Sequence, residues 1–189
     1  MNDYNLSFSF VTSINSQKEF ISNSKGNLSY NLSADCQKNN IYTLAKAFLL
    51  ISDMTNKKLQ KLCYYAKGWY LALYDVNLIS EQFQAWVHGA VQPALYHKYK
   101  GYGFNNIPKL LVNNGIPEEF ICFAQEIYLS YGHLTGDELE RLNHQEEPWL
   151  NARKDCQPWE NSTNIISEED MKNFFRKMMI DGYTESTGK

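Results

Sequence analysis

Two neighbouring stretches decide the fold: MTNKKLQKLCYYAKGWYLALYD, residues 54–75, and FQAWVHGAVQPALYHKYKGYG, residues 83–103. In the first stretch, apolar residues recur every three or four positions, which predicts one face of an α-helix. The spacing therefore predicts a long central helix over residues 55–75. The apolar positions on this face are Leu59, Leu62, Cys63, Ala66, Trp69, Tyr70 and Leu73.

Charged and small residues on this helix predict its surroundings. Four lysines, Lys57, Lys58, Lys61 and Lys67, are expected to mark the side that remains exposed to solvent. Gly68 lies in the middle of the helix, where glycine costs about 1 kcal/mol relative to alanine. Such a glycine predicts that the backbone of another segment passes close to it.

The second stretch follows a different period. Phe83, Ala85 and Val87 alternate with other residues, which is typical of a short extended piece. Gly89 allows a turn, and Pro93 suits the first position of a helix, where its missing N–H costs nothing.

Helical patterns account for most of the remaining chain. They predict helices over residues 41–51, from Pro117 to Gly132, after the capping box at Thr135, and from Ser167 to a stop at Gly182. The predicted fold class is therefore mainly α: a compact helical domain with a long central helix and a short extended piece near residues 83–87. Ahead of it lies an N-terminal extension that can form β-strands.

The extension differs in composition from the rest of the chain. Residues 1–38 are rich in serine and asparagine, yet Tyr4, Leu6, Phe8 and Phe10 alternate with polar residues as in a strand, and so do Leu28, Tyr30 and Leu32. The extension is therefore a candidate β-hairpin or a toxin-specific arm. A disordered tail is the competing interpretation. We expect three parts: the extension at residues 1–38, a helical domain at residues 39–182, and a tail at residues 183–189.

Composition excludes several classes of protein. The chain has 189 residues, of which 43% are hydrophobic, enough for a core without disulfides or metals. A net charge of −3 argues against a nucleic-acid binder driven by its overall field. The four cysteines form no CxxC pair, the start lacks the features of a signal peptide, and no apolar run could span a bilayer. We therefore expect a cytoplasmic location.

Three motifs resemble a known family. KLQKLCYYAKGWYLAL at residues 58–73, AWVHGAVQPALYHKYKGYG at residues 85–103 and YGHLTGDELERLNHQEEPWLNAR at residues 131–153 are similar to the Panacea domain. This is an antitoxin family of phage-associated, GepA/SocA-like proteins, often encoded in prophages. The resemblance extends from about Ile41 to Arg153. One departure is Ala90, where the family usually has proline after the glycine.

The resemblance implies an antitoxin of a type II toxin–antitoxin pair. Such a protein neutralises, by direct binding, a cognate protein toxin encoded by an adjacent gene. The alternative is an adaptor that delivers its bound toxin to a cytoplasmic AAA+ protease. A monomer or weak homodimer without cofactor is expected. Residues 1–38 lie outside the resemblance, so they are candidates for a toxin-specific arm whose contacts would be Tyr4, Leu6, Phe8 and Phe10.

Twelve residues of the matching motifs are candidate signature positions, either defining the fold or contacting the toxin. Tyrosine and tryptophan are frequent hot-spot residues of interfaces, but a protein that accepts diverse partners should keep its frame constant. The twelve are Lys58, Gln60, Lys61, Tyr64, Trp69, Trp86, His88, Gly89, Val91, Tyr96, His144 and Trp149.

Two rival functions are less favoured. An enzyme would pair Cys63 with His88 or His97, but Cys63 lies on the apolar stripe, where a buried thiol is the simpler interpretation. Residues 144–147, HQEE, lack the helical spacing of zinc ligands and are expected to form an exposed helix end. A DNA-binding autorepressor is disfavoured by the acidic balance. We therefore predict no enzyme, no catalytic residue and no metal site.

Overall fold

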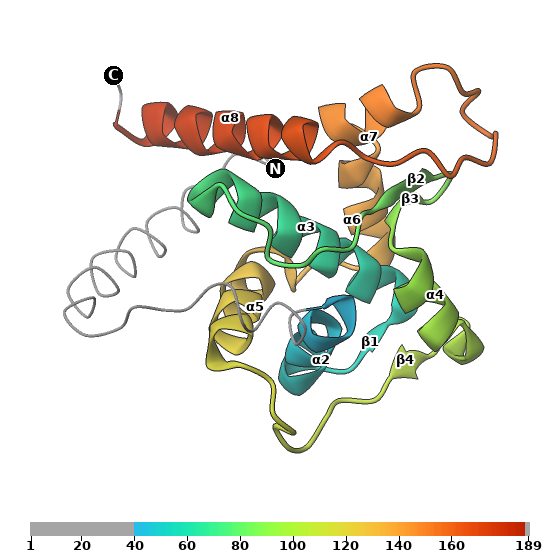
Figure 1. Cartoon of the computed structure of the whole chain (residues 1–189), viewed down its shortest axis with the longest axis vertical. Coiled ribbons are helices and arrows are strands. Elements are labelled where there is room, and N and C mark those ends of the chain that lie inside the picture. Colours follow the sequence, from blue (N-terminus) through green and yellow to red (C-terminus); the bar gives the residue numbers. More distant parts are fainter. Residues whose placement is uncertain (1–39, 188–189) are drawn as a thin grey trace.

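The computed structural model describes residues 40–187, with side chains described as far as Asp181. This part is mainly α-helical, as predicted (Figure 1). Its elements are α2 (Ile41–Ile51), β1 (Met54–Thr55), α3 (Asn56–Tyr74), β2 (Gln84–Trp86), β3 (Gly89–Val91), α4 (Pro93–Tyr99), η1 (Lys100–Tyr102), β4 (Asn106–Ile107), α5 (Glu118–Tyr131), α6 (Gly136–Asn143), α7 (Glu147–Ala152) and α8 (Glu168–Thr187).

The predicted central helix is confirmed as α3. The hydroxyl of Thr55 caps its first turn by accepting a hydrogen bond from the N–H of Lys58, and Asp75 ends it in the left-handed conformation. Helix α3 packs against α8, α5, α6 and the β3 strand, so neighbours cover it on several sides (Figure 1). Trp69 and Leu62 are fully buried on this helix.

The prediction for Gly68 was wrong about which kind of group lies next to the glycine. What approaches this glycine is the ring of Phe175 on α8, not a backbone; a Cβ at position 68 would collide with that ring. Phe175 is itself fully buried and also packs on Trp69, with ring centroids 5.2 Å apart. The glycine therefore lets α8 lie close to α3.

The prediction that Lys61 and Lys67 are exposed was also wrong. Only 1% of Lys61 and none of Lys67 is accessible to solvent. The ammonium group of Lys67 donates to the carbonyl oxygen of Glu81 at 2.7 Å and pairs with the carboxylate of Glu168, the first residue of α8. Lys67 is buried because polar groups from two distant segments solvate it in place of water.

The extended piece predicted near residues 83–87 forms one strand of a β-hairpin. Strand β2 pairs antiparallel with β3, with Ala85 opposite Ala90 and Trp86 opposite Gly89. The segment before α8 adds a bridge on the other side of β2, where Ile165 lies opposite Gln84. Three short extended segments therefore lie side by side beneath α7 and the start of α8 (Figure 1).

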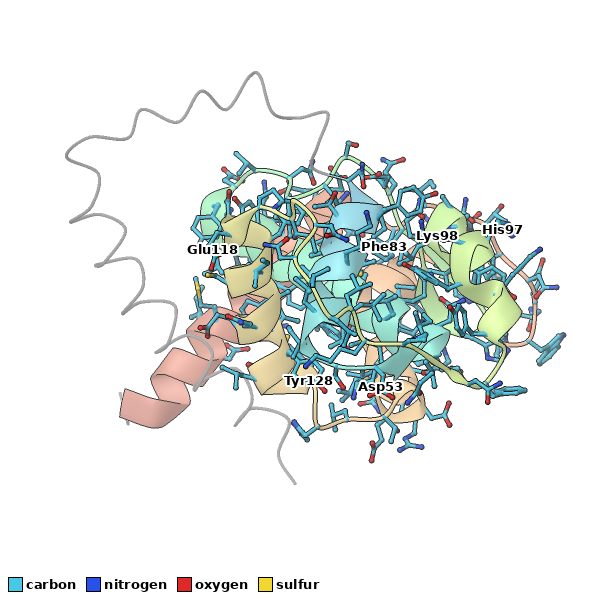
Figure 2. All side chains as sticks on the ribbon, turned by 90° about the horizontal axis from the view of Figure 1, so that it is seen from below. Asp53, Phe83, His97, Lys98, Glu118 and Tyr128 are labelled. Carbon is cyan, nitrogen blue, oxygen red and sulfur yellow. The ribbon has the colours of Figure 1, made fainter. Side chains whose placement is uncertain are left out.

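The opposite end of the body is built around α2, which packs against α5, α3 and α4. Figure 2 shows α5, with Glu118 and Tyr128, and α4, with His97 and Lys98, on opposite sides of the body. Strands β1 and β4 pair antiparallel, with Met54 opposite Ile107.

The last helix does not stop at Gly182, since α8 continues to Thr187. Ser167 does cap its start, as predicted, by accepting a hydrogen bond from the N–H of Asp170. Within residues 40–187, no helix combines the length and the apolar character needed to cross a membrane.

Candidate functional site

Most of the predicted signature residues meet where the β2–β3 hairpin lies on α3. Lys61 extends from α3 into this junction and donates two hydrogen bonds to the hairpin, to the carbonyl oxygens of His88 at 2.6 Å and Ala90 at 2.9 Å. Burial lowers the pKa of Lys61 to about 7, partly offset by the carboxylates of Glu140 and Glu146. Lys61 thus fastens the hairpin to the central helix.

The turn of the hairpin needs glycine at position 89 for two reasons. Gly89 has a φ of +90°, a conformation that residues with a Cβ rarely adopt. A Cβ there would also collide with the amino group of Lys61 and the side-chain oxygen of Asn143. The close approach of Lys61 therefore requires the glycine. The next position accepts the departure from the family pattern, since Ala90 is fully buried within β3.

On the edge of β3 that faces away from β2, side chains bond to the backbone groups of the strand and of Gln92, the residue that follows it. The N–H of Ala90 donates to the side-chain oxygen of Asn143 at 2.5 Å, and the N–H of Gln92 donates to that of Gln60 at 2.8 Å. Lys61 also donates to the carbonyl oxygen of Ala90. Side chains from α3 and α6 therefore provide the hydrogen-bond partners that a further strand would otherwise provide. This edge is closed to further pairing.

A buried carboxylate continues the polar network beneath the hairpin. Glu146 accepts hydrogen bonds from the hydroxyl of Tyr65 at 2.7 Å and the side-chain amide of Asn143 at 2.9 Å. Burial raises the pKa of Glu146 despite these bonds, and it raises the pKa of the neighbouring Tyr64 and Tyr65 hydroxyls. The expectation of an exposed helix end at residues 144–147 was therefore wrong for Glu146, which is buried, whereas Gln145 and Glu147 are exposed after the end of α6.

The motif at residues 143–153 holds the hairpin from the other side. The indole N–H of Trp149 donates to the carbonyl oxygen of Trp86 at 3.1 Å, and the guanidinium of Arg153 donates to that of Ala85 at 3.0 Å. His144 stacks on Trp149 with ring centroids 4.4 Å apart. Burial lowers the pKa of His144, which therefore gains no net stabilisation of its charge at the end of α6.

Two signature residues lie apart from this junction. Lys58 donates to the carbonyl oxygen of Gly132 at 2.6 Å, at the end of α5, and its ammonium lies over the ring of Tyr128. Trp69 is buried further along α3, where its indole N–H donates to the hydroxyl of Tyr131 at 3.0 Å. Both residues join α3 to α5.

The hairpin also carries signature residues at its surface. Trp86 is only partly buried and packs against Tyr96, with ring centroids 5.1 Å apart, while Val91 is buried. The imidazole of His88 is largely exposed and lies 3.1 Å from a carboxylate oxygen of Glu140. Tyr4, Leu6, Phe8 and Phe10 lie outside the described residues.

Sequence reasoning missed four residues of this junction. Asn143, Glu146, Arg153 and Tyr65 all hydrogen-bond within it, yet they were not singled out. All four lie inside the quoted motifs, and a polar residue in the middle of an otherwise apolar pattern is the signal that could have marked Tyr65 and Asn143. Cys63 is buried, with its pKa raised by burial, which agrees with the interpretation of a packed thiol. No cluster of three or more metal-ligating side chains occurs among the described residues.

A second feature is a segment that exposes apolar side chains. Residues 103–116 connect η1 to α5, and Phe104 is fully accessible to solvent while Leu111 is 93% accessible. The backbone of the same segment is held by β4 and by a 2.8 Å hydrogen bond from the N–H of Leu110 to the carbonyl oxygen of Leu49 on α2. An anchored backbone therefore presents unpacked apolar residues.

Comparisons with known proteins agree with these motifs. The family model described as "Antitoxin SocA-like, Panacea domain" matches residues 59–150. "Antitoxin SocA" of Caulobacter vibrioides (strain NA1000 / CB15N) is 26% identical over 123 residues, covering 56% of this chain and 63% of that protein. The match therefore spans less than two thirds of the length of this relative. No solved structure matches the chain.

The matched segment begins in α3 and ends in α7. It contains the β2–β3 hairpin and, among the residues that bond to it, Lys61, Asn143 and Trp149, whereas Arg153 lies just beyond the match. Residues 59–150 are therefore similar to the Panacea domain of the antitoxin SocA-like family, in agreement with the resemblance of the three motifs.

Proposed function

We propose that this protein is the antitoxin of a type II toxin–antitoxin pair and neutralises a cognate protein toxin by binding it directly. The observation that carries the proposal is the family match over residues 59–150, together with a relative whose name is that of an antitoxin. Neutralisation at nanomolar Kd requires about −12 kcal/mol of binding free energy. An interface of roughly 1,600 Å² is typical of such complexes.

The polar junction under the hairpin supports a structural role for most signature residues. The side chains of Lys61, Gln60 and Asn143 are buried, and they hydrogen-bond to the backbone of the hairpin or of Gln92, which follows it. A toxin could not reach these groups without opening the domain. We therefore look for the toxin-binding surface on exposed residues outside this buried junction.

The segment at residues 103–116 is our candidate for part of that surface. Isolated exposed apolar residues are common, but Phe104, Leu111 and Val112 are exposed together on one anchored segment. An aromatic side chain held by a fixed backbone loses little entropy on binding, which is the property of a hot-spot residue. The toxin would bury these side chains in an apolar recess of its own.

Co-expression with the product of the adjacent gene tests the proposal. If that product stops growth when expressed alone, the antitoxin should restore growth and should elute with the toxin as one complex. Failure to protect against a toxic neighbour would reject the antitoxin function. The half-life of the toxin distinguishes direct neutralisation, which leaves it unchanged, from delivery to a protease, which shortens it.

A matched pair of variants tests the surface. The Phe104→Ser/Leu111→Ser protein should keep its melting temperature but lose protection. Leu129→Ser on α5 is the control, since Leu129 is also largely exposed, at 75%, but lies on another element. Equal protection by both variants would exclude residues 103–116 from the interface.

A further inference from the structure

The segment that leads into α8 has an unpaired edge. The N–H of Ala85 donates to the carbonyl oxygen of Asn164 at 2.8 Å, and the N–H of Ile166 donates to that of Phe83 at 2.9 Å. Because paired groups alternate along an antiparallel strand, the N–H and C=O of Ile165 face away from β2. Among the described residues, neither group has a hydrogen-bond partner.

The two outer edges of this three-segment sheet therefore differ. The β3 edge is closed by side chains from α3 and α6, as described above. The Ile165 edge is open, and the side chain of Ile165 is itself about half exposed. Open edges with apolar side chains favour pairing with another strand, and folded proteins usually cover or charge them.

A pocket lies near the open edge, since Asn164, the residue before Ile165, contacts Cys156 in the pocket wall. It has a volume of about 380 Å³ and lies between the hairpin turn, α7 and the segment that follows α7. The side-chain amide of Asn164 is 3.8 Å from the sulfur of Cys156 in the pocket wall. Leu150 in the pocket wall is exposed, and so is Trp159, which follows the lining residue Pro158 in the chain. The pocket is lined by Val87, His144, Trp149, Leu150, Arg153, Lys154, Cys156 and Pro158.

The chain outside the described residues contains a segment that fits this edge. Between positions 4 and 10, large apolar residues alternate with small polar ones, so a strand there would have one aromatic-rich face: Tyr4, Leu6, Phe8 and Phe10. A single strand of this kind is not stable in water and requires a sheet edge. The edge at Ile165 is one such edge among the described residues.

The place where this segment joins the body favours the same edge. At the start of α2, the N–H of Ile41 donates to the carboxylate of Glu81 at 3.1 Å. Glu81 lies two residues before Phe83, whose carbonyl oxygen pairs with Ile166. Residues 11–39 would remain as a connection, and a flexible coil of that length spans roughly 30 Å. A connection of this length lets residues 4–10 lie well away from the start of α2.

We propose that residues 4–10 of this chain add to the sheet as a strand against Ile165 and cover the neighbouring pocket with their apolar face. The N–H and C=O of Ile165 would then form hydrogen bonds to this strand. The proposal replaces a free N-terminal arm with a docked one, and it does not depend on the identity of the toxin.

Amide hydrogen exchange of Ile165 in the full chain tests the pairing. The Leu6→Ser/Phe8→Ser variant should exchange this amide at least about tenfold faster than the parent, because the added strand is lost. The amide of Gln92, bonded to Gln60 on the closed edge, should not change. Leu28→Ser/Tyr30→Ser, in another alternating stretch of the same extension, should leave Ile165 protected. Equal exchange at Ile165 in parent and Leu6→Ser/Phe8→Ser variant overturns the proposal.

Thiol alkylation gives a second measurement. Cys156 lies in the pocket wall, whereas Cys122 is a partly exposed thiol on α5 and serves as an internal control. The Leu6→Ser/Phe8→Ser variant should alkylate Cys156 several-fold faster than the parent, with no change at Cys122. Protection of Cys156 that rises with protein concentration would indicate a second copy on the edge. Protection that appears only when toxin is added would assign the edge to the toxin, and either result overturns the proposal.

Discussion

The β2–β3 hairpin and the segment at residues 103–116 are both short non-helical parts of one helical body. They differ in whether the side chains around them are buried and hydrogen-bonded or exposed to solvent. The hairpin satisfies its backbone groups with buried polar side chains such as Lys61, Asn143 and Trp149. The other segment uses backbone contacts to hold itself in place and leaves Phe104 and Leu111 in solvent. The difference separates residues that maintain the fold from residues that are available to a partner.

Loss of the buried lysine should have the largest effect on stability. Lys61→Met leaves the carbonyl oxygens of His88 and Ala90 without their donor, which should cost about 2–4 kcal/mol of unfolding free energy. Lys57→Met, one turn earlier on the same helix, removes a partly exposed ion pair with Asp137 and should cost less than about 1 kcal/mol. Chemical denaturation measures both. Similar losses in the two variants would mean that the hairpin does not depend on Lys61.

A series of three glycines should separate backbone strain from collision. Gly89→Ala introduces both and should cost about 2–3 kcal/mol, whereas Gly115→Ala, with a φ of +78° and open space around it, should cost about 1 kcal/mol. Gly101→Ala has neither problem and should be close to neutral. Thermal unfolding of the three proteins gives the order, and an equal loss at positions 89 and 115 would refute the collision with Lys61.

The stability of the hairpin junction should depend on pH between about 7 and 9.5. The pKa of Lys61 is about 7 when folded and about 10.5 when unfolded, so the unfolded chain binds more protons in this range. The unfolding free energy should therefore rise with pH, by up to about 1.4 kcal/mol per unit. Glu140, Lys57 and Glu146 also act on Lys61, so the Lys61→Met variant is the reference. A parent and variant with parallel pH profiles would show that Lys61 does not titrate there.

The smallest change in stability is expected in the exposed segment. Because Phe104 and Leu111 make almost no buried contact, Phe104→Ser/Leu111→Ser should change the unfolding free energy by less than about 0.5 kcal/mol. Calorimetry and the protection assay together measure both properties, since this variant should lose function without losing stability. A substantial drop in melting temperature would show that the segment belongs to the frame.

Local sequence patterns determined the helices because helix formation depends on neighbours three and four positions apart. The apolar spacing from Leu59 to Leu73 located α3, the capping box at Thr135 located the start of α6, and Pro93 located the start of α4. The same stretches resemble the Panacea domain, and the family model matches residues 59–150.

Only the tertiary structure decided which polar residues are buried. Lys61 and Lys67 have the composition of an exposed helix side, yet both are enclosed, because their partners at His88, Ala90 and Glu168 come from distant parts of the chain. The same holds for Glu146, which was expected at an exposed helix end and is bonded to Tyr65 on α3. A hydrogen bond between residues tens of positions apart leaves no periodic trace in the sequence, whereas the geometry of the fold brings its two ends together.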